Sequence, residues 1–213
     1  MNSYTKEQIY SARIEIVRAQ VERFHEFYNS YFQRAETLRM VEYFFEKIYN
    51  PEGKKEWVEL AIGSYEHVKS IMKESTQESV DHLIELNQRT DELDEKMGIL
   101  LLDSGWDGKS KISRTDYDTF FKQLGYAKER REQLTFVLNN MSQFYELAHR
   151  PINAYIMTPL KYVTKTIGLF PIYAILEEGY LSCLPVKREI FEEFHKEVER
   201  KENEYLDRLL PLQ

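Results

Sequence analysis

Apolar residues recur every three or four positions through most of this chain, in long stretches separated by short polar breaks. This spacing is typical of amphipathic α-helices, in which the apolar side chains form one stripe. Glycine and proline, which interrupt helices, number only 8 and 6 among 213 residues and mostly fall between those stretches. The pattern predicts an all-α protein, a single-domain bundle of eight or nine helices with short connections that covers residues 1–213.

The breaks give approximate helix boundaries. The first helix is expected at residues 5–34, where it is free to project from the bundle, and the next two at 36–49 and 55–73. Ser75 and Glu78 have the spacing of a capping box, which opens a fourth helix that runs to residue 102. Further helices are expected to end at Gly125, to span 128–149, to start at Pro159 after an N-cap at Thr158, to start at Pro171 and to follow Pro185.

Charge and cysteine content narrow the class of protein. The net charge is −7, and acidic and basic residues alternate along the helices, which disfavours nucleic-acid binding because no basic stripe is present. Cys183 is the only cysteine, so no disulfide forms within the chain. The first residues lack the pattern of a signal peptide, and charged residues and prolines interrupt the apolar segment 152–184. A cytoplasmic protein without a membrane span is therefore expected.

Three histidines follow a glutamate by three residues, which is the spacing of ligands in di-iron helical bundles. The pairs are Glu22–His25, Glu146–His149 and Glu192–His195. At about 100° per residue, each histidine falls at the edge of its apolar stripe and each glutamate falls further toward solvent. We therefore expect no metal site and no cofactor, and we keep Glu146, His149, Glu192 and His195 only as alternative metal ligands.

The polar loop at residues 103–113 resembles a calcium-binding loop in part. Counting from Asp103 places Gly108 at the required sixth position, but Arg114 then occupies the twelfth, where a glutamate binds calcium. An ordinary polar loop is the better interpretation, with Trp106 folded back onto the bundle.

The fourth helix carries polar residues on or beside its apolar side, namely Asn87, Thr90 and Asp94. A buried carboxylate requires a cation or several hydrogen-bond donors. The candidate partners on later helices are Arg150, Lys161 and Lys165. With such a partner Asp94 is a structural tether between two halves of the bundle; otherwise Asn87, Thr90 and Asp94 line a ligand pocket.

Several short segments resemble an uncharacterised family of bacterial all-helical proteins. They are Phe44-Phe45-Glu-Lys-Ile48-Tyr49-Asn-Pro51, Glu85-Leu86, Thr90, Leu93-Asp94, Gly168-Leu169 and Glu178-Gly179-Tyr180. The resemblance extends over much of the chain. It implies a bacterial cytosolic protein and draws attention to Thr90 and Asp94, but it supplies no activity.

No catalytic or cofactor-binding motif stands out, so the sequence favours a non-enzymatic bundle that binds a protein partner or a small apolar ligand. The expected site is the polar cluster of the fourth helix together with residues 150–180. One alternative is a metal- or haem-dependent enzyme or sensor. The other is a protein that attaches to a membrane surface through residues 151–185, where apolar residues accompany Lys161 and Lys165.

Overall fold

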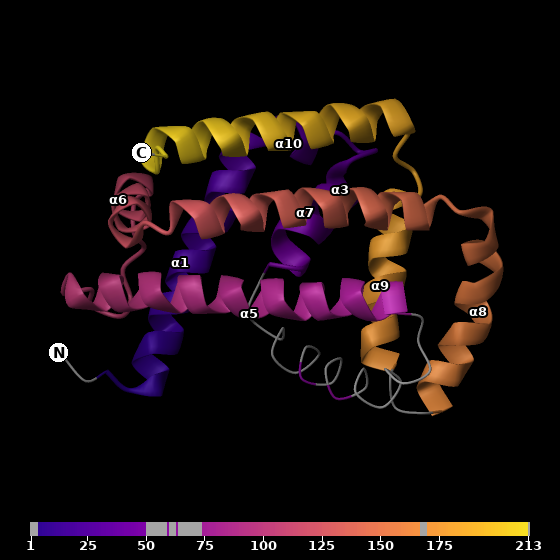
Figure 1. The fold of residues 1–213 in the computed structure, drawn as a ribbon, viewed down its shortest axis with the longest axis horizontal. Coiled ribbons are helices and arrows are strands. Elements are labelled where there is room, and N and C mark those ends of the chain that lie inside the picture. The colour runs from indigo at the N-terminus through magenta and orange to yellow at the C-terminus, as the bar shows by residue number, and fades with distance from the viewer. Residues whose placement is uncertain (1–3, 50–58, 60–62, 64–73, 167–169, 213) are drawn as a thin grey trace.

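The computed structural model describes residues 4–49, 59, 63, 74–166 and 170–212, and it confirms the all-α prediction for them. These residues form nine α-helices and one π-helix joined by short connections (Figure 1). The elements are α1 (Lys6–Phe27), α2 (Asn29–Phe32), α3 (Leu38–Glu42), η1 (Tyr43–Lys47), α5 (Glu74–Asp103), α6 (Arg114–Leu124), α7 (Ala127–Ala148), α8 (Pro151–Thr166), α9 (Phe170–Cys183) and α10 (Arg188–Leu209).

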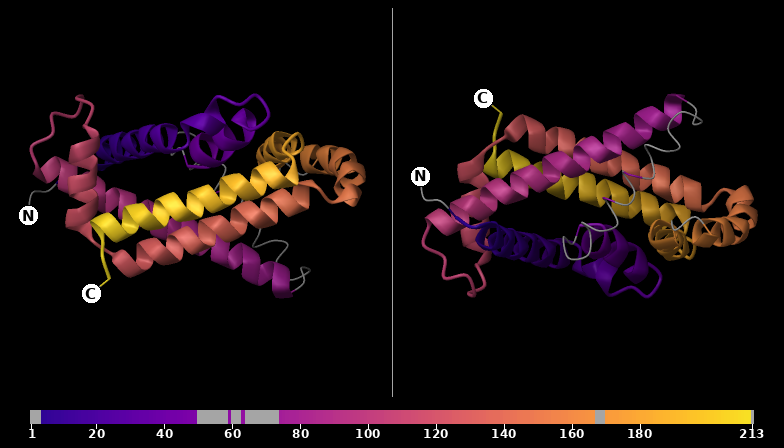
Figure 2. Two further views of the ribbon diagram at one scale, coloured as in Figure 1. Left: turned by 90° about the horizontal axis from the view of Figure 1, so that it is seen from above. Right: turned by 90° about the horizontal axis from the view of Figure 1, so that it is seen from below.

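Three long helices, α5, α7 and α10, run along the length of the molecule, and α7 and α10 lie side by side (Figures 1 and 2). Helix α1 crosses α5 in the most extensive helix pairing, and it therefore does not project from the bundle as the sequence allowed. The two backbones approach closely, because a Cβ on Gly98 of α5 would lie 3.0 Å from the backbone nitrogen of Arg13. Helices α8 and α9 pack together at the opposite end from α6.

In the part of the chain that the structure describes, the buried apolar residues form two clusters. One gathers α1, α3 and η1 with the second half of α7 and the start of α10, around Tyr28, Phe45 and Phe194. The other gathers the first half of α1 with α5, α6 and the end of α10, around Ile16 and Met97. Among the described helices, α1, α7 and α10 bury most of the stripe that the sequence pattern assigned to them, although Tyr10 of α1 is exposed.

The first predicted helix divides at Tyr28, whose backbone leaves the helical region at φ −115° and ψ 22°. The division allows both Tyr28 and Tyr31 to be fully buried, and their hydroxyls donate to carboxylates of α10. The second predicted helix is only partly α-helical, because Tyr43–Lys47 form a π-helix after α3. The buried Tyr43 ring occupies the space that a Cβ on Gly179 of α9 would need.

Two predicted helix starts are wrong. Helix α8 begins at Pro151 and continues through Pro159. Pro159 has no N–H to donate within the helix, but it is exposed, so solvent reaches that side of the helix. Helix α5 begins at Glu74, so Ser75 lies inside it and not before it. The end of α6 at Gly125 is confirmed, and that glycine has a φ of 77°, which favours glycine. The helix predicted at 55–73 lies outside the described residues, apart from positions 59 and 63.

Candidate functional site

Asp94 is buried, as the helical pattern predicted, with 2% of its surface exposed. Its described partners are Arg130 of α7, at 4.0 Å between Nη1 and Oδ1, and the Tyr49 hydroxyl, which donates over 3.1 Å. Arg150, Lys161 and Lys165, the candidate partners from sequence, are not among these two described contacts of Asp94. Arg130 is 7% exposed and lies at the start of α7, whereas the three candidates from sequence follow the end of α7.

Polar contacts continue from Arg130 along the seam between α5 and α7. Arg130 donates to Gln133 over 3.1 Å, and Gln133 donates to the buried Thr90 hydroxyl over 2.6 Å. Asn87 lies half-buried about one turn before Thr90. The structure thus brings Thr90 and Asp94 into one polar seam of hydrogen bonds and the Asp94–Arg130 ion pair, which supports the structural interpretation of these residues.

Replacing Asp94 with alanine is expected to lower the free energy of unfolding by about 3 kcal/mol, because Arg130 would remain buried without its carboxylate. Denaturant titration measures the change. Glu95→Ala on the exposed side of the same helix is the control and should stay within about 0.5 kcal/mol of the parent. Equal midpoints for Asp94→Ala and the parent would show that the α5–α7 seam does not depend on this carboxylate.

A second buried ion pair, which sequence analysis missed, joins α1 to α10. Arg23 is 2% exposed, and its two terminal nitrogens donate to the two carboxylate oxygens of Glu202, each over 2.7 Å. The Tyr28 hydroxyl donates to the same carboxylate over 2.7 Å. Burial lowers the pKa of Arg23, but the charge and hydrogen bonds of Glu202 outweigh burial and raise it above its ordinary value.

Aromatic rings and further polar groups enclose this ion pair. The Arg23 guanidinium lies 4.4 Å from the Tyr205 ring centre and 4.7 Å from that of Phe24, which belong to the two different apolar clusters. Gln20 accepts from Arg23 over 3.1 Å and also from the Tyr117 hydroxyl of α6. The pair therefore ties α1, α6 and α10 together where the two clusters meet.

Tyr117 lies within electrostatic range of both ion pairs. Burial raises the pKa of its hydroxyl, while the charges of Arg23 and Arg130 oppose that rise. Burial and the charge of Asp94 likewise raise the pKa of Tyr49. These phenols are therefore neutral hydrogen-bond donors at physiological pH, and their arrangement stabilises the bundle.

The Glu/His pairs have the orientation that the helical angles predicted. Their three glutamates are exposed, and Glu146 is bound by Arg188 at 2.6 Å. His149 and His195 are half-buried. A ring nitrogen of His149 donates to the Tyr145 carbonyl and one of His195 to the Leu138 carbonyl, each over 3.0 Å. Within residues 4–49 and the later described ranges, no three His, Cys, Asp or Glu side chains gather as a metal-ion site would require.

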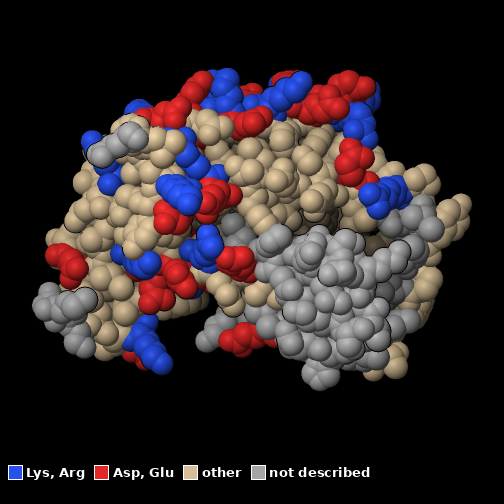
Figure 3. Space-filling model, viewed as in Figure 1, with Lys and Arg blue, Asp and Glu red and all other residues tan. Residues whose placement is uncertain are grey.

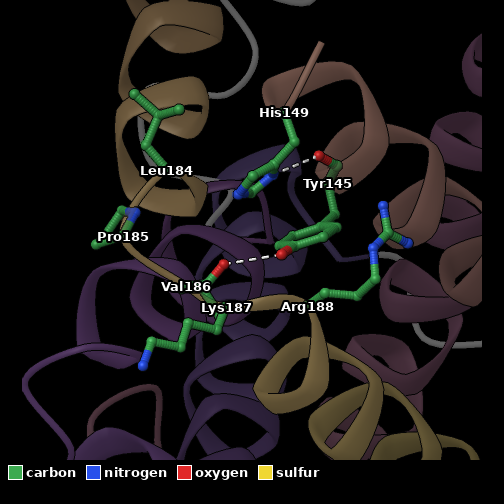
Figure 4. A pocket seen from close by; sticks show the side chains of 7 residues that line it. All are labelled: Tyr145, His149, Leu184, Pro185, Val186, Lys187 and Arg188. Atoms are coloured by element: carbon green, nitrogen blue, oxygen red, sulfur yellow. Dashed lines mark hydrogen bonds between the residues drawn. The ribbon is translucent and has the colours of Figure 1, made fainter. Parts of the chain in front are cut away.

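A shallow recess of about 300 Å³ lies between the end of α7 and the start of α10 (Figure 4). Tyr145 and His149 form one wall, and the Tyr145 hydroxyl donates to the Val186 carbonyl over 2.8 Å. Lys187 and Arg188 extend along its rim in Figure 4, where Glu146 neutralises Arg188. The recess combines an aromatic wall with Lys187 at its rim.

The loop between α5 and α6 satisfies its own polar groups. The Asp107 carboxylate accepts from the Lys109 and Ser110 backbone nitrogens over 2.9 and 2.7 Å and from the Ser110 hydroxyl over 2.6 Å. These bonds lower the pKa of Asp107 to about 2. Trp106 donates to the Ser110 carbonyl and packs against the second apolar cluster, as expected of an ordinary folded-back loop.

The outer side of α8 carries large side chains in solvent. Tyr155 is 80% exposed and Tyr162 is 68% exposed, and they lie two helical turns apart on one side. We define the α8 face by those residues of this helix that the structure describes as exposed, which are Pro151, Tyr155, Thr158, Pro159, Tyr162, Lys165 and Thr166.

One exposed cation belongs to this face, a second precedes it, and a third is neutralised. Arg150 precedes the helix and is exposed, and exposed Lys165 lies near its end, 4.9 Å from the Phe170 ring centre. Lys161 is half-buried and pairs with Glu177 of α9 at 3.2 Å. The site residues predicted from sequence therefore divide into the α5–α7 seam and the neighbourhood of the α8 face.

A sequence signal for the α8 face exists. Residues 147–176 contain neither aspartate nor glutamate, although acidic residues outnumber basic ones in the chain by 36 to 29. Of the nine large apolar or tyrosine side chains that are exposed among the described residues, six lie in or next to this stretch. They are Leu147, Tyr155, Tyr162, Leu176, Leu181 and Leu184.

Comparison with known proteins identifies the family without supplying an activity. No curated protein and no solved structure matches this chain. A family model described as a domain of unknown function, DUF8198, matches residues 2–212, which confirms the resemblance to an uncharacterised family. The chain therefore belongs to the DUF8198 family.

Proposed function

We propose that this protein is a non-enzymatic binding protein that docks a partner through the α8 face. The observation that carries the proposal is the exposure of Tyr155 and Tyr162 on one side of a helix that lies within residues 147–176, a stretch of sequence without aspartate or glutamate. Tyrosine is enriched where proteins bind partners, because its ring excludes water while its hydroxyl still forms hydrogen bonds.

The remaining candidate residues support this choice because they serve the fold. Asp94 and Arg23 are buried and engaged with Arg130 and Glu202, and these contacts stabilise helix packing. The glutamates of the His pairs face solvent, which gives the metal- or haem-dependent alternative no support from these residues. Bacterial origin and a cytoplasmic location remain predictions.

Cysteine accessibility tests the proposal, and the chain suits the method. Cys183 is fully buried, and burial raises the pKa of its thiol to about 11, so background labelling by maleimide is low. The test variants are Tyr155→Cys and Tyr162→Cys. Tyr10→Cys on α1 is the matched control, because Tyr10 is 49% exposed and far from α8 in the chain.

All three variants should react quickly as purified proteins. In cells that contain the protein naturally, Tyr155→Cys and Tyr162→Cys should react more slowly than Tyr10→Cys, because a docked partner covers the α8 face. Equal labelling rates at all three positions in cells would contradict the proposal.

A further inference from the structure

The shape of the α8 face suits a flat partner. Helix α8 has 16 residues and is about 24 Å long, and it lies at one end of the molecule in all three views (Figures 1 and 2). Tyr155 and Tyr162 protrude from a single convex helix and do not line the recess of Figure 4. Both rings can therefore contact one flat surface at once, at positions about 11 Å apart along the helix axis.

Charge distinguishes this face from the rest of the molecule. Glu177 and Glu178, which end the acid-free stretch, are paired with Lys161 at 3.2 Å and with Lys47 at 3.0 Å. Among the described residues of 150–166, Arg150 and Lys165 therefore carry positive charge in addition to the Lys161–Glu177 pair, within a chain of net charge −7. A negatively charged surface attracts this end of the molecule and repels much of the remainder, which fixes the orientation of docking.

The contrast is visible on the molecular surface. Charged side chains of both signs crowd the surface over α10 along the top of Figure 3, whereas the described surface at the α8 edge is mostly uncharged. Tyrosine beside lysine or arginine is the combination that favours the interface between water and lipid, where the ring enters the headgroup layer.

From these observations we infer that the partner of the α8 face is an anionic phospholipid membrane surface. The inference rests on the proposed docking function and assigns its partner. Tyr155 and Tyr162 enter the headgroup region while Arg150 and Lys165 contact lipid phosphates. The helix lies on the surface, and no helix among the described residues is long and apolar enough to cross a bilayer.

Co-sedimentation of the purified full chain with vesicles tests the inference. The chain should bind vesicles of equimolar phosphatidylcholine and phosphatidylglycerol, should bind phosphatidylcholine alone much more weakly, and should dissociate as salt is added. Arg150→Gln/Lys165→Gln should lower the partition coefficient about 25-fold, because each cation near an anionic surface contributes about fivefold. Tyr155→Ser/Tyr162→Ser should lower it by about tenfold.

The matched control is Lys122→Gln/Lys196→Gln, which removes the same charge from exposed positions on α6 and α10 and should bind like the parent. Absence of binding by the parent, or equal losses in control and test variants, would overturn the inference. Protection of Tyr155→Cys in cells without vesicle binding would refute the membrane but leave the docking function intact, with a protein as partner. Absence of both would refute both proposals.

Discussion

Replacing Glu202 with alanine is expected to lower the free energy of unfolding by about 3–5 kcal/mol, at least as large a loss as that expected for Asp94→Ala. The reason is that Arg23, only 2% exposed, would keep its charge in the interior without the carboxylate that binds both of its terminal nitrogens. The Tyr28 hydroxyl would lose the same acceptor. Chemical denaturation followed by circular dichroism measures the difference.

Two further variants separate the ion pair from general effects on α10. Glu199→Ala, at an exposed position of this helix, should remain within about 0.5 kcal/mol of the parent. Arg23→Met/Glu202→Leu removes both charges, so it should be much more stable than Glu202→Ala. A double variant no more stable than the single one would show that side-chain volume, and not the unpaired charge, causes the loss.

Alkaline unfolding is the second large expected effect. At several core positions, burial is the largest cause that raises the tyrosine pKa above its ordinary value of about 10. The positions are Tyr28, Tyr31, Tyr43, Tyr49, Tyr117 and Tyr205. Above pH 10 the unfolded chain releases these protons while the folded protein retains them, so stability falls as pH rises.

Each such tyrosine removes about 1.4 kcal/mol of stability per pH unit above pH 10, and together they should produce a steep loss of structure between about pH 10 and 12. Circular dichroism and the near-ultraviolet absorbance of tyrosinate should change together, because the core phenols ionise on unfolding. Tyr117→Phe should make the decline less steep, whereas Tyr10→Phe should not. Ionisation of the core tyrosines without any loss of helix would contradict the assignment.

The helical pattern predicted what depends on neighbouring residues along the chain. It gave the fold class, most helices, the burial of Asp94 and the outward direction of Glu146, because these follow from spacing within one helix. It placed a break at Thr158, where the structure has continuous helix. The helix continues there because Pro159 is exposed, and an exposed proline is less unfavourable than one packed in a core.

The helical pattern could not predict pairing between residues that are far apart in the sequence. Arg23 and Glu202 are separated by 179 positions, and each resembles a surface charge until the crossing of α1 with α10 is known. The partner of Asp94 was missed for a similar reason, since Arg130 lies in the first turn of a helix among other charged residues. The sequence analysis offered residues 151–185 as a surface segment but did not single out Tyr155 or Tyr162, because a tyrosine fits a core stripe as well as a surface.

Photo-crosslinking in cells tests most directly whether the α8 face is a docking surface. A photoreactive amino acid replaces Tyr155 or Tyr162 in the test proteins and Tyr126, which is 41% exposed, in the control. We predict adducts from the two α8 positions and none from Tyr126, with lipid in the adducts if the membrane inference holds. Adducts from Tyr126 alone, or equal adducts from all three positions, would contradict this account.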